Sequence, residues 1–279
     1  EILRCLVGSE MCIRDRAYTP WEWHEELFHV AKEEGLICFS SPFDKTAVDM
    51  LEALDCPVYK IASFEITDIP LIEYAASKHK PMVLATGIAT EEDIQLAVEA
   101  CRRMGNNDIT VLKCTSSYPA PVEEANLCMI RDLAERFQVK SGLSDHTLGS
   151  VSPIVAVTQG ASMIEKHFIL NRSIGGPDCS FSMEEKDFAQ MVKDVRMAEL
   201  SLGKTTYELT EKMRGSRSAS RSLYVAEDMK AGEVITERNV RSVRPGFGLH
   251  PKYLKDILGK NVNRDLEKGT RFALEYVNG

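Results

Sequence analysis

The sequence predicts an α/β fold: a parallel sheet of the (β/α)8 barrel type that lacks two strands, followed by a small separate domain. Three observations support this prediction. Between residues 19 and 202, short apolar runs alternate with helical patterns at intervals of roughly 25 to 30 residues, as βαβ units require. Polar residues recur where most of the apolar runs end. After residue 202 the chain becomes polar and then loses helical periodicity.

The elements follow one another in a regular order. Apolar runs bounded by turn residues predict strands, and an apolar period near 3.6 residues predicts the helices between them. The predicted strands are 36–41, 58–63, 81–85, 109–114, 139–143 and 163–169. The predicted helices are 21–34, 46–54, 69–77, 91–104, 127–137, 153–160 and 183–202. The pattern therefore opens on a helix that no predicted strand precedes.

The strand count falls two short of a closed barrel, which has eight strands and about 250 residues. Residues 17–202 supply only 186 residues. An open, doubly wound sheet is the alternative, but it would concentrate polar residues at one switch point. Here they follow most of the strands, so we favour a barrel that has lost its first two strands.

The chain divides into four predicted parts. Residues 1–16 show neither helix nor strand period; they are either foreign to the protein or a genuine segment with poor patterning. Residues 17–205 form the incomplete barrel, and residues 206–221 form a polar linker. Residues 222–279 combine short strand-like runs with many turn residues, which predicts a small module.

The composition argues against several classes of protein. A net charge of −8 argues against a nucleic-acid binder but allows a local basic site for an anionic metabolite. No run of about 18 apolar residues occurs, so we expect no membrane span. The eight cysteines include no CxxC pair, and residues such as Cys38 and Cys114 fit buried thiols of a cytoplasmic protein.

Two short segments carry the strongest chemical signal. His146 lies in GLSDHT and His167 in IEKHF, each near the end of a predicted strand. Strand ends of a parallel barrel converge on one rim, so the two imidazoles could share one metal ion. A single histidine on a strand is more often a hydrogen-bonded structural residue. The polar residues at the other strand ends favour the metal site.

From residue 19 onward the chain resembles the sialic acid synthase family, on motifs that occur in order: FSSPFDKTAVDML, PVYKIASFEITDIPLI, KPMVLATGIAT, LKCTSSYPAP, GLSDHT, IEKHF, GGPD and SVRPGFGLHP. The resemblance implies a TIM barrel with a C-terminal antifreeze-like (SAF) domain, in a domain-swapped homodimer. It implies metal-dependent condensation of phosphoenolpyruvate with an acylated amino-hexose, the metal being Mn²⁺ or Mg²⁺. The segments FEITD, KCTSSYPAP and SIGGPDCSFS resemble the pseudaminic acid branch, whose sugar is 2,4-diacetamido-2,4,6-trideoxy-altropyranose, more than the N-acetylneuraminate branch.

The resemblance also assigns catalytic residues. His146 and His167 match the metal ligands, and Glu65 matches a carboxylate near the metal and the sugar aldehyde. A divalent ion on two neutral imidazoles keeps open coordination positions and can polarise that carbonyl. Glu65 has a second interpretation, as a charge at the start of the helix that follows it.

The predicted substrate-binding residues lie at or beyond strand ends: Ser41, Lys60, Ser63, Lys113, Ser116, Tyr118, Ser144, Glu165, Asp178 and Arg244. The serines and Lys60 match phosphoenolpyruvate contacts, whose anionic groups require cations and hydroxyl donors. Strict alternation would put Lys60 and Ser63 on opposite faces, so the strand must break near Ala62. Tyr118 and Asp178 match sugar contacts.

The remaining assignments rest on position or on the predicted dimer. Lys113 ends a strand and is placed near the anion, and Glu165 faces inward, to orient ligands or to pair with a lysine. Arg244 matches an arginine that the partner subunit presents to the sugar; an exposed turn is the alternative from spacing alone.

Two departures from the family pattern stand out. Ser116 and Ala85 occupy positions where the N-acetylneuraminate branch has asparagine and serine, and the family's AEIG-like and KFQ-like N-terminal segments are missing. We therefore expect an N-terminally truncated copy with an open barrel edge. Three functions compete: the synthase (an N-acetylneuraminate or legionaminate synthase being the nearest alternative), a metal-dependent aldolase acting on pyruvate, and an inactive sugar or metal binder.

Overall fold

The computed structural model describes residues 19–176 and 178–278, and the chain forms two compact units that divide after Gly203. The expectation that residues 1–16 are foreign or poorly patterned lies outside the described residues. Within the described part of the chain, no helix has the length and apolar content needed to cross a membrane.

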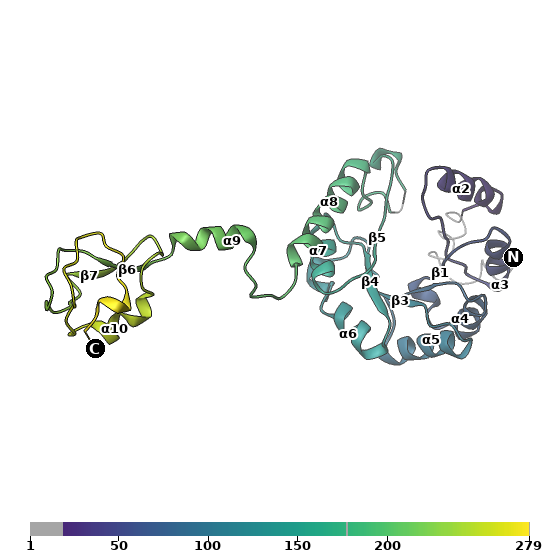
Figure 1. The fold of residues 1–279 in the computed structure, drawn as a ribbon. Helices are drawn as coiled ribbons and strands as arrows, with labels where there is room; N and C mark the ends of the chain where they lie inside the picture. The colour runs from purple at the N-terminus through teal and green to yellow at the C-terminus, as the bar shows by residue number, and fades with distance from the viewer. Residues whose placement is uncertain (1–18, 177, 279) are drawn as a thin grey trace. The chain divides into compact units, whose positions relative to one another are not determined.

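The first unit is a parallel sheet flanked by helices (Figure 1). Its strands pair in chain order, β1-β2-β3-β4-β5, each parallel to its neighbour. They are β1 (Tyr59–Ile61), β2 (Met82–Ala85), β3 (Ile109–Cys114), β4 (Lys140–Asp145) and β5 (Ile164–Lys166). Because the order contains no reversal, the doubly wound alternative is wrong, and the predicted parallel barrel type, here an incomplete one, is confirmed.

Helices alternate with these strands. They are α2 (Trp21–Glu33), α3 (Lys45–Ala53), α4 (Ile69–Ala76), α5 (Glu91–Arg103), α6 (Met129–Phe137), α7 (Val151–Thr158) and α8 (Glu185–Leu202). Local sequence signals start three of them. Asp44 and Asp68 accept hydrogen bonds from the backbone N–H groups three residues later, and Thr90 forms a capping box with Asp93. All seven predicted helices are present, with ends within two residues of the predictions.

The first predicted strand is wrong. Residues 36–41 form only an isolated bridge, from Ser40 to Tyr59. Leu36 and Ile37 are 68% and 75% exposed, so no layer of the described residues packs over this apolar run. Without a second neighbour, the run does not become a strand of the sheet.

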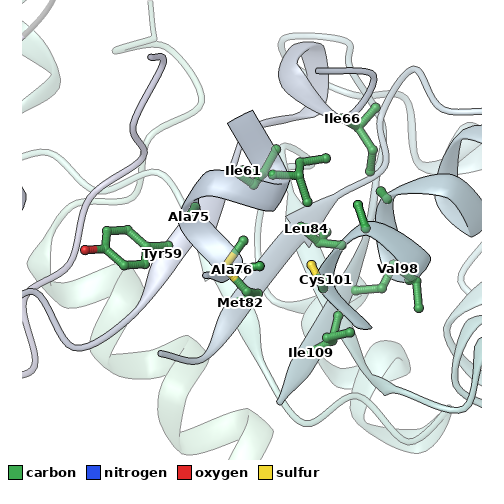
Figure 2. Packing of buried hydrophobic residues seen from close by; sticks show 14 of the residues in the cluster. Tyr59, Ile61, Ile66, Ala75, Ala76, Met82, Leu84, Val98, Cys101 and Ile109 are labelled. Carbon is green, nitrogen blue, oxygen red and sulfur yellow. The ribbon is translucent and has the colours of Figure 1, made fainter. Parts of the chain in front are cut away.

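The largest core cluster lies between the sheet and the helices (Figure 2). Ile61, Leu84 and Ile109 are at most 1% exposed and belong to one cluster with Val98 and Cys101 of α5. Since successive side chains of a strand point to opposite faces, the alternate residues point to the inner face of the sheet. The functional side chains lie on that inner face.

The second unit is small and built differently. Its elements are α9 (Glu211–Ser216), the antiparallel pair β6 (Ser222–Val225) and β7 (Val240–Val243), and α10 (Leu254–Ile257). Leu223, Val240 and Phe272 are at most 1% exposed and belong to its own core. The segment predicted as a polar linker contains the six-residue helix α9.

Candidate active site at the carboxyl ends of the strands

A pocket of about 150 Å³ lies at the carboxyl ends of the strands. Seven of its lining residues were predicted from the sequence: Lys60, Ser63, Tyr118, Ser144, His146, Glu165 and His167. Both Lys60 and Ser63 reach it because β1 ends at Ile61 and a 3₁₀ turn begins at Ser63. The predicted break near Ala62 is therefore confirmed.

The two histidines face each other, each anchored on one ring nitrogen. Their ring centres are 5.1 Å apart, with ring planes inclined by 74°. His146 Nδ1 lies 2.8 Å from the carbonyl oxygen of Thr115, which can only accept, so this nitrogen donates. His167 Nδ1 lies 3.5 Å from Asp178 Oδ2. The Thr115 contact occupies Nδ1 of His146, so Nε2 is the nitrogen of that ring able to bind a metal ion.

This pair fits a divalent ion with open coordination positions. Two imidazoles that share one ion at about 2.1 Å from each nitrogen place their ring centres roughly 5 Å apart, close to the observed separation. Among the described residues, no group of three or more histidine, cysteine or acidic side chains is placed to hold a metal ion. Two imidazole ligands on one ion would leave its other coordination positions open to a substrate or water.

Electrostatics distinguish the two imidazoles. Burial, followed by the neighbouring His146, lowers the pKa of His167. Burial acts in the same direction on His146, but hydrogen bonds with Cys114 and the Thr115 carbonyl outweigh it and raise its pKa. Burial would raise the pKa of the Cys114 thiol, yet hydrogen bonds with His146 and Ser63 lower it. The imidazole of His167 therefore loses its proton at lower pH than that of His146.

A charged pair forms one wall of the pocket. Lys60 Nζ lies 2.7 Å from Glu165 Oε1, and the same oxygen accepts a hydrogen bond from Ser144 Oγ at 2.8 Å. Glu165 thus faces inward as predicted, and it holds both an ammonium and a hydroxyl at the pocket surface. The Lys60 ammonium is thus fixed before a ligand arrives and keeps N–H donors for an anion, whereas the Ser144 hydroxyl gives its one proton to Glu165.

A glycine makes room for two hydroxyls next to this wall. Gly87 N–H donates to Ser63 Oγ at 3.1 Å. A Cβ on Gly87 would lie 2.0 Å from Ser116 Oγ and 2.8 Å from Ser63 Oγ. Ser116 Oγ is buried and has no hydrogen-bond partner within the described part of the chain. Such an orphaned hydroxyl is typical of a group that bonds a ligand.

Aromatic rings surround the histidines. The Tyr118 ring centre is 4.3 Å from that of His146, and the Phe181 ring centre is 4.9 Å from that of His167. Phe181 is 3% exposed, whereas Tyr118 is 48% exposed. The buried ring restrains His167, and the exposed one is open to a substrate.

Other predicted residues are not among those that line the pocket. Glu65 sits on the 3₁₀ turn after β1 with one carboxylate oxygen buried, and Asp178 is half exposed beside His167. Ser41 is not among the lining residues; Phe43 of the same segment is. Arg244 is exposed in the second unit.

The structure does not bring Lys113 to the pocket. It pairs in register with Leu143, which packs with Ile130 on the helix side of the sheet. Its ammonium donates to Cys114 O at 2.7 Å, and burial lowers its pKa. The prediction that Lys113 lies near the anion is therefore not supported, because alternation along β3 puts Cys114, and not Lys113, on the inner face.

The sequence analysis missed several site residues, and three of them bear on the chemistry. Cys114 lines the pocket, Gly87 leaves room for two serines, and Phe181 packs on His167. Cys114 ends a predicted strand two residues before Ser116, so its position at the rim was a usable signal. Gly87 and Phe181 gave no such signal, because their roles depend on contacts between distant segments.

Fold and pocket together define a class: an α/β protein of the parallel barrel type with a histidine-containing polar site at the carboxyl ends of its strands, joined to a small β domain. The chain belongs to the NeuB family, whose model matches residues 7–207. A SAF domain matches residues 220–271.

Named relatives agree with this assignment. The chain is 50% identical over 263 residues to a pseudaminic acid synthase of Helicobacter pylori, covering 94% of this chain and 77% of the relative. It is 46% identical to a pseudaminic acid synthase of Campylobacter jejuni strain 81-176, covering 91% and 74%. A crystal structure of an N-acetylneuraminic acid synthetase from Leptospira borgpetersenii, in complex with citrate, superposes with a TM-score of 0.71 at 29% identity, covering 77% of this chain and 75% of that one.

Proposed function

We propose that this chain is a pseudaminic acid synthase, a transferase that condenses phosphoenolpyruvate with 2,4-diacetamido-2,4,6-trideoxy-altropyranose. The observation that carries the proposal is the pocket in which the Lys60 ammonium and the Ser63 hydroxyl, both able to donate to an anion, adjoin the His146–His167 pair. The particular sugar is supported by 50% identity to a pseudaminic acid synthase, against 29% to the N-acetylneuraminic acid synthetase.

The residues suit the two halves of the reaction. Lys60 and the serine hydroxyls bind the phosphate and carboxylate of phosphoenolpyruvate, while Glu165 keeps Lys60 and Ser144 in place. C3 of phosphoenolpyruvate then attacks the sugar aldehyde, water adds at C2, and phosphate leaves with cleavage of its C–O bond. A Mn²⁺ or Mg²⁺ ion held by His146 and His167 supplies a Lewis acid for the carbonyl when bound.

Three further residues are assigned to proton transfer and to sugar binding. Glu65 follows Ser63 on the same 3₁₀ turn, and Tyr118 and Asp178 lie on the histidine side of the site, where the sugar binds. We assign Glu65 to proton transfer at the aldehyde oxygen, and Tyr118 and Asp178 to sugar contacts.

Phosphate release from phosphoenolpyruvate tests the proposal. The full chain with Mn²⁺ is given the altro sugar, N-acetylmannosamine or no sugar, and a parallel assay replaces phosphoenolpyruvate by pyruvate and measures the condensation product. Release with the altro sugar alone is expected. Release with N-acetylmannosamine would move the chain to the N-acetylneuraminate branch, and condensation of pyruvate without any phosphate requirement would make it an aldolase. Mn²⁺ binding without turnover on any sugar would make it a binder.

Replacing Lys60 by methionine is expected to raise KM for phosphoenolpyruvate about 10- to 100-fold, because a hydrogen bond to a charged group contributes roughly 1.5–3 kcal/mol. The matched control is Lys113→Met, on the next-but-one strand but on the helix side of the sheet. Steady-state kinetics should give a KM within about twofold of the wild type for that control. Equal effects of the two substitutions would contradict the assignment of Lys60.

We further propose a cytoplasmic homodimer in which the C-terminal unit of one copy presents Arg244 to the pocket of the other. Charge supports it: residues 1–203 carry a net charge of −13 and residues 204–279 one of +5. Mixing inactive Arg244→Ala and His146→Ala chains should recover about a quarter of wild-type activity, since half of the mixed population pairs one intact pocket with one intact arginine. No recovery would mean that Arg244 acts within its own chain or not at all.

A further inference from the structure

A buried ion pair lies directly beside the two histidines. Lys166 Nζ on β5 lies 2.8 Å from Asp145 Oδ2 on β4, and each side chain is 2% exposed. The two residues are also register partners in the sheet. Alternation places Lys166 on the face opposite to Glu165, and neither member of the pair lines the pocket. The pair therefore does not contact a substrate in the pocket.

The Lys166–Asp145 pair bonds to the backbone of the residue that follows His146. The Lys166 ammonium donates both to Asp145 Oδ2 and to the carbonyl oxygen of Thr147, the residues on either side of that histidine. Asp145 Oδ1 accepts a hydrogen bond from Thr147 N–H at 2.9 Å. Lys166 directly precedes His167 in the chain. One ammonium thus joins the segment that carries the first histidine to the segment that carries the second.

Stability alone is a poor reason for such a pair. Removing two charges from water costs much of what their attraction returns, so two apolar side chains of similar volume hold strands together at least as well. Lys140 and Asp108, which join β4 to the segment before β3, are 63% and 50% exposed and carry no such desolvation cost. What the buried pair adds over an apolar contact is a fixed direction and distance between the ends of β4 and β5.

We propose that Lys166 and Asp145 are positioning residues that set the separation and inclination of His146 and His167, and through them the affinity for a divalent cation. The inference rests on the proposed metal-dependent function. It predicts that loss of the pair weakens Mn²⁺ binding and lowers kcat, and leaves KM for phosphoenolpyruvate near the wild-type value, since Lys60 and Glu165 lie on the other face.

Mn²⁺ titration followed by electron paramagnetic resonance tests the proposal on the full chain. The key variant is Lys166→Met/Asp145→Leu, which replaces both charges by apolar groups and so retains thermal stability. The expected result is a melting temperature near that of the wild type with a Kd for Mn²⁺ raised about 10- to 100-fold. A wild-type Kd in this folded variant would overturn the proposal.

A second variant covers the case in which the double variant does not fold. Asp145→Asn keeps the size of the side chain and an oxygen for Thr147 N–H but removes the charge that holds Lys166. It should raise the Kd for Mn²⁺ severalfold, whereas an unchanged Kd would again overturn the proposal. Lys140→Met/Asp108→Leu, at the opposite end of β4, serves as the matched control and should bind Mn²⁺ as the wild type does.

His146→Ala separates this inference from the proposed function. If that substitution leaves Mn²⁺ binding unchanged, the histidine pair is not the metal site, and the metal ligands assigned in the proposed function are wrong. If it abolishes binding while the double variant binds normally, only the positioning role fails.

Discussion

Replacing His146 by alanine is expected to reduce phosphate release from phosphoenolpyruvate about 10³-fold at saturating substrates. A Lewis acid contributes several kcal/mol to the transition state, and each 1.4 kcal/mol corresponds to a factor of ten in rate. Its ring lies 5.1 Å from that of His167, and the alanine variant leaves only one imidazole for the ion. Coupled phosphate detection under steady-state conditions measures the effect.

His24 provides a matched control. It is also buried, at 7% exposure, and its Nδ1 also bonds a backbone carbonyl, that of Pro20, at 3.1 Å. His24→Ala should lower the melting temperature without changing kcat, because α2 contributes no residue that lines the pocket. If the two alanine variants lost activity in parallel, His146 would be a structural histidine and the metal assignment would be wrong.

Replacing Gly87 by alanine is expected to lower kcat/KM for phosphoenolpyruvate about a hundredfold, with a fall in melting temperature from the lost hydrogen bond to Ser63. The new methyl group would lie 2.0 Å from Ser116 Oγ and 2.8 Å from Ser63 Oγ. Both hydroxyls must rotate away from the new methyl group, and Ser63 Oγ then loses its hydrogen bond from Gly87 N–H. The anion then loses two donors, each contributing roughly 1.5 kcal/mol or more to a charged acceptor.

Gly215→Ala is the control for that experiment. No atom lies within 4 Å of a Cβ built on Gly215, and the residue belongs to the helix α9, where alanine is favoured by about 1 kcal/mol. Its kinetics should match the wild type and its melting temperature should not fall. Wild-type kinetics for Gly87→Ala would show that Ser63 and Ser116 do not bind the substrate.

The sequence predicted the sheet well where burial and propensity agree. The strand 109–114 is a mostly apolar run whose residues are nearly all buried in the structure. The helix 91–104 has a clear apolar period, and the structure forms the Thr90–Asp93 capping box at its start. The run 36–41 has strand-like composition too, yet it forms one bridge at Ser40. Strand-like composition shows only that the residues are compatible with a strand. A strand forms where a neighbouring segment is available for pairing and packing.

The candidate site was also predicted only in part from the sequence. His146 and His167 were found because they end strands, and strand ends of a parallel barrel meet on one rim. Lys60, Ser63 and Ser144 were found by resemblance to the sialic acid synthase family, and Glu165 by its place on the same strand face as His167. Lys113 was misplaced because a shift of one position along a strand exchanges the two faces. Gly87 could not be found, since its significance is a close approach to Ser63 and Ser116 from other segments.

The sequence by itself determined the order of strands and helices, the division into two units, the family and the histidine pair. Each of these depends on residue types and spacings along the chain. Only the tertiary structure decided that Glu165 holds Lys60 and Ser144, that Lys166 and Asp145 enclose His146, and that Cys114 faces the pocket. These contacts join residues up to 105 positions apart in the chain. They depend on strand register, because the register determines the face of the sheet to which each side chain points.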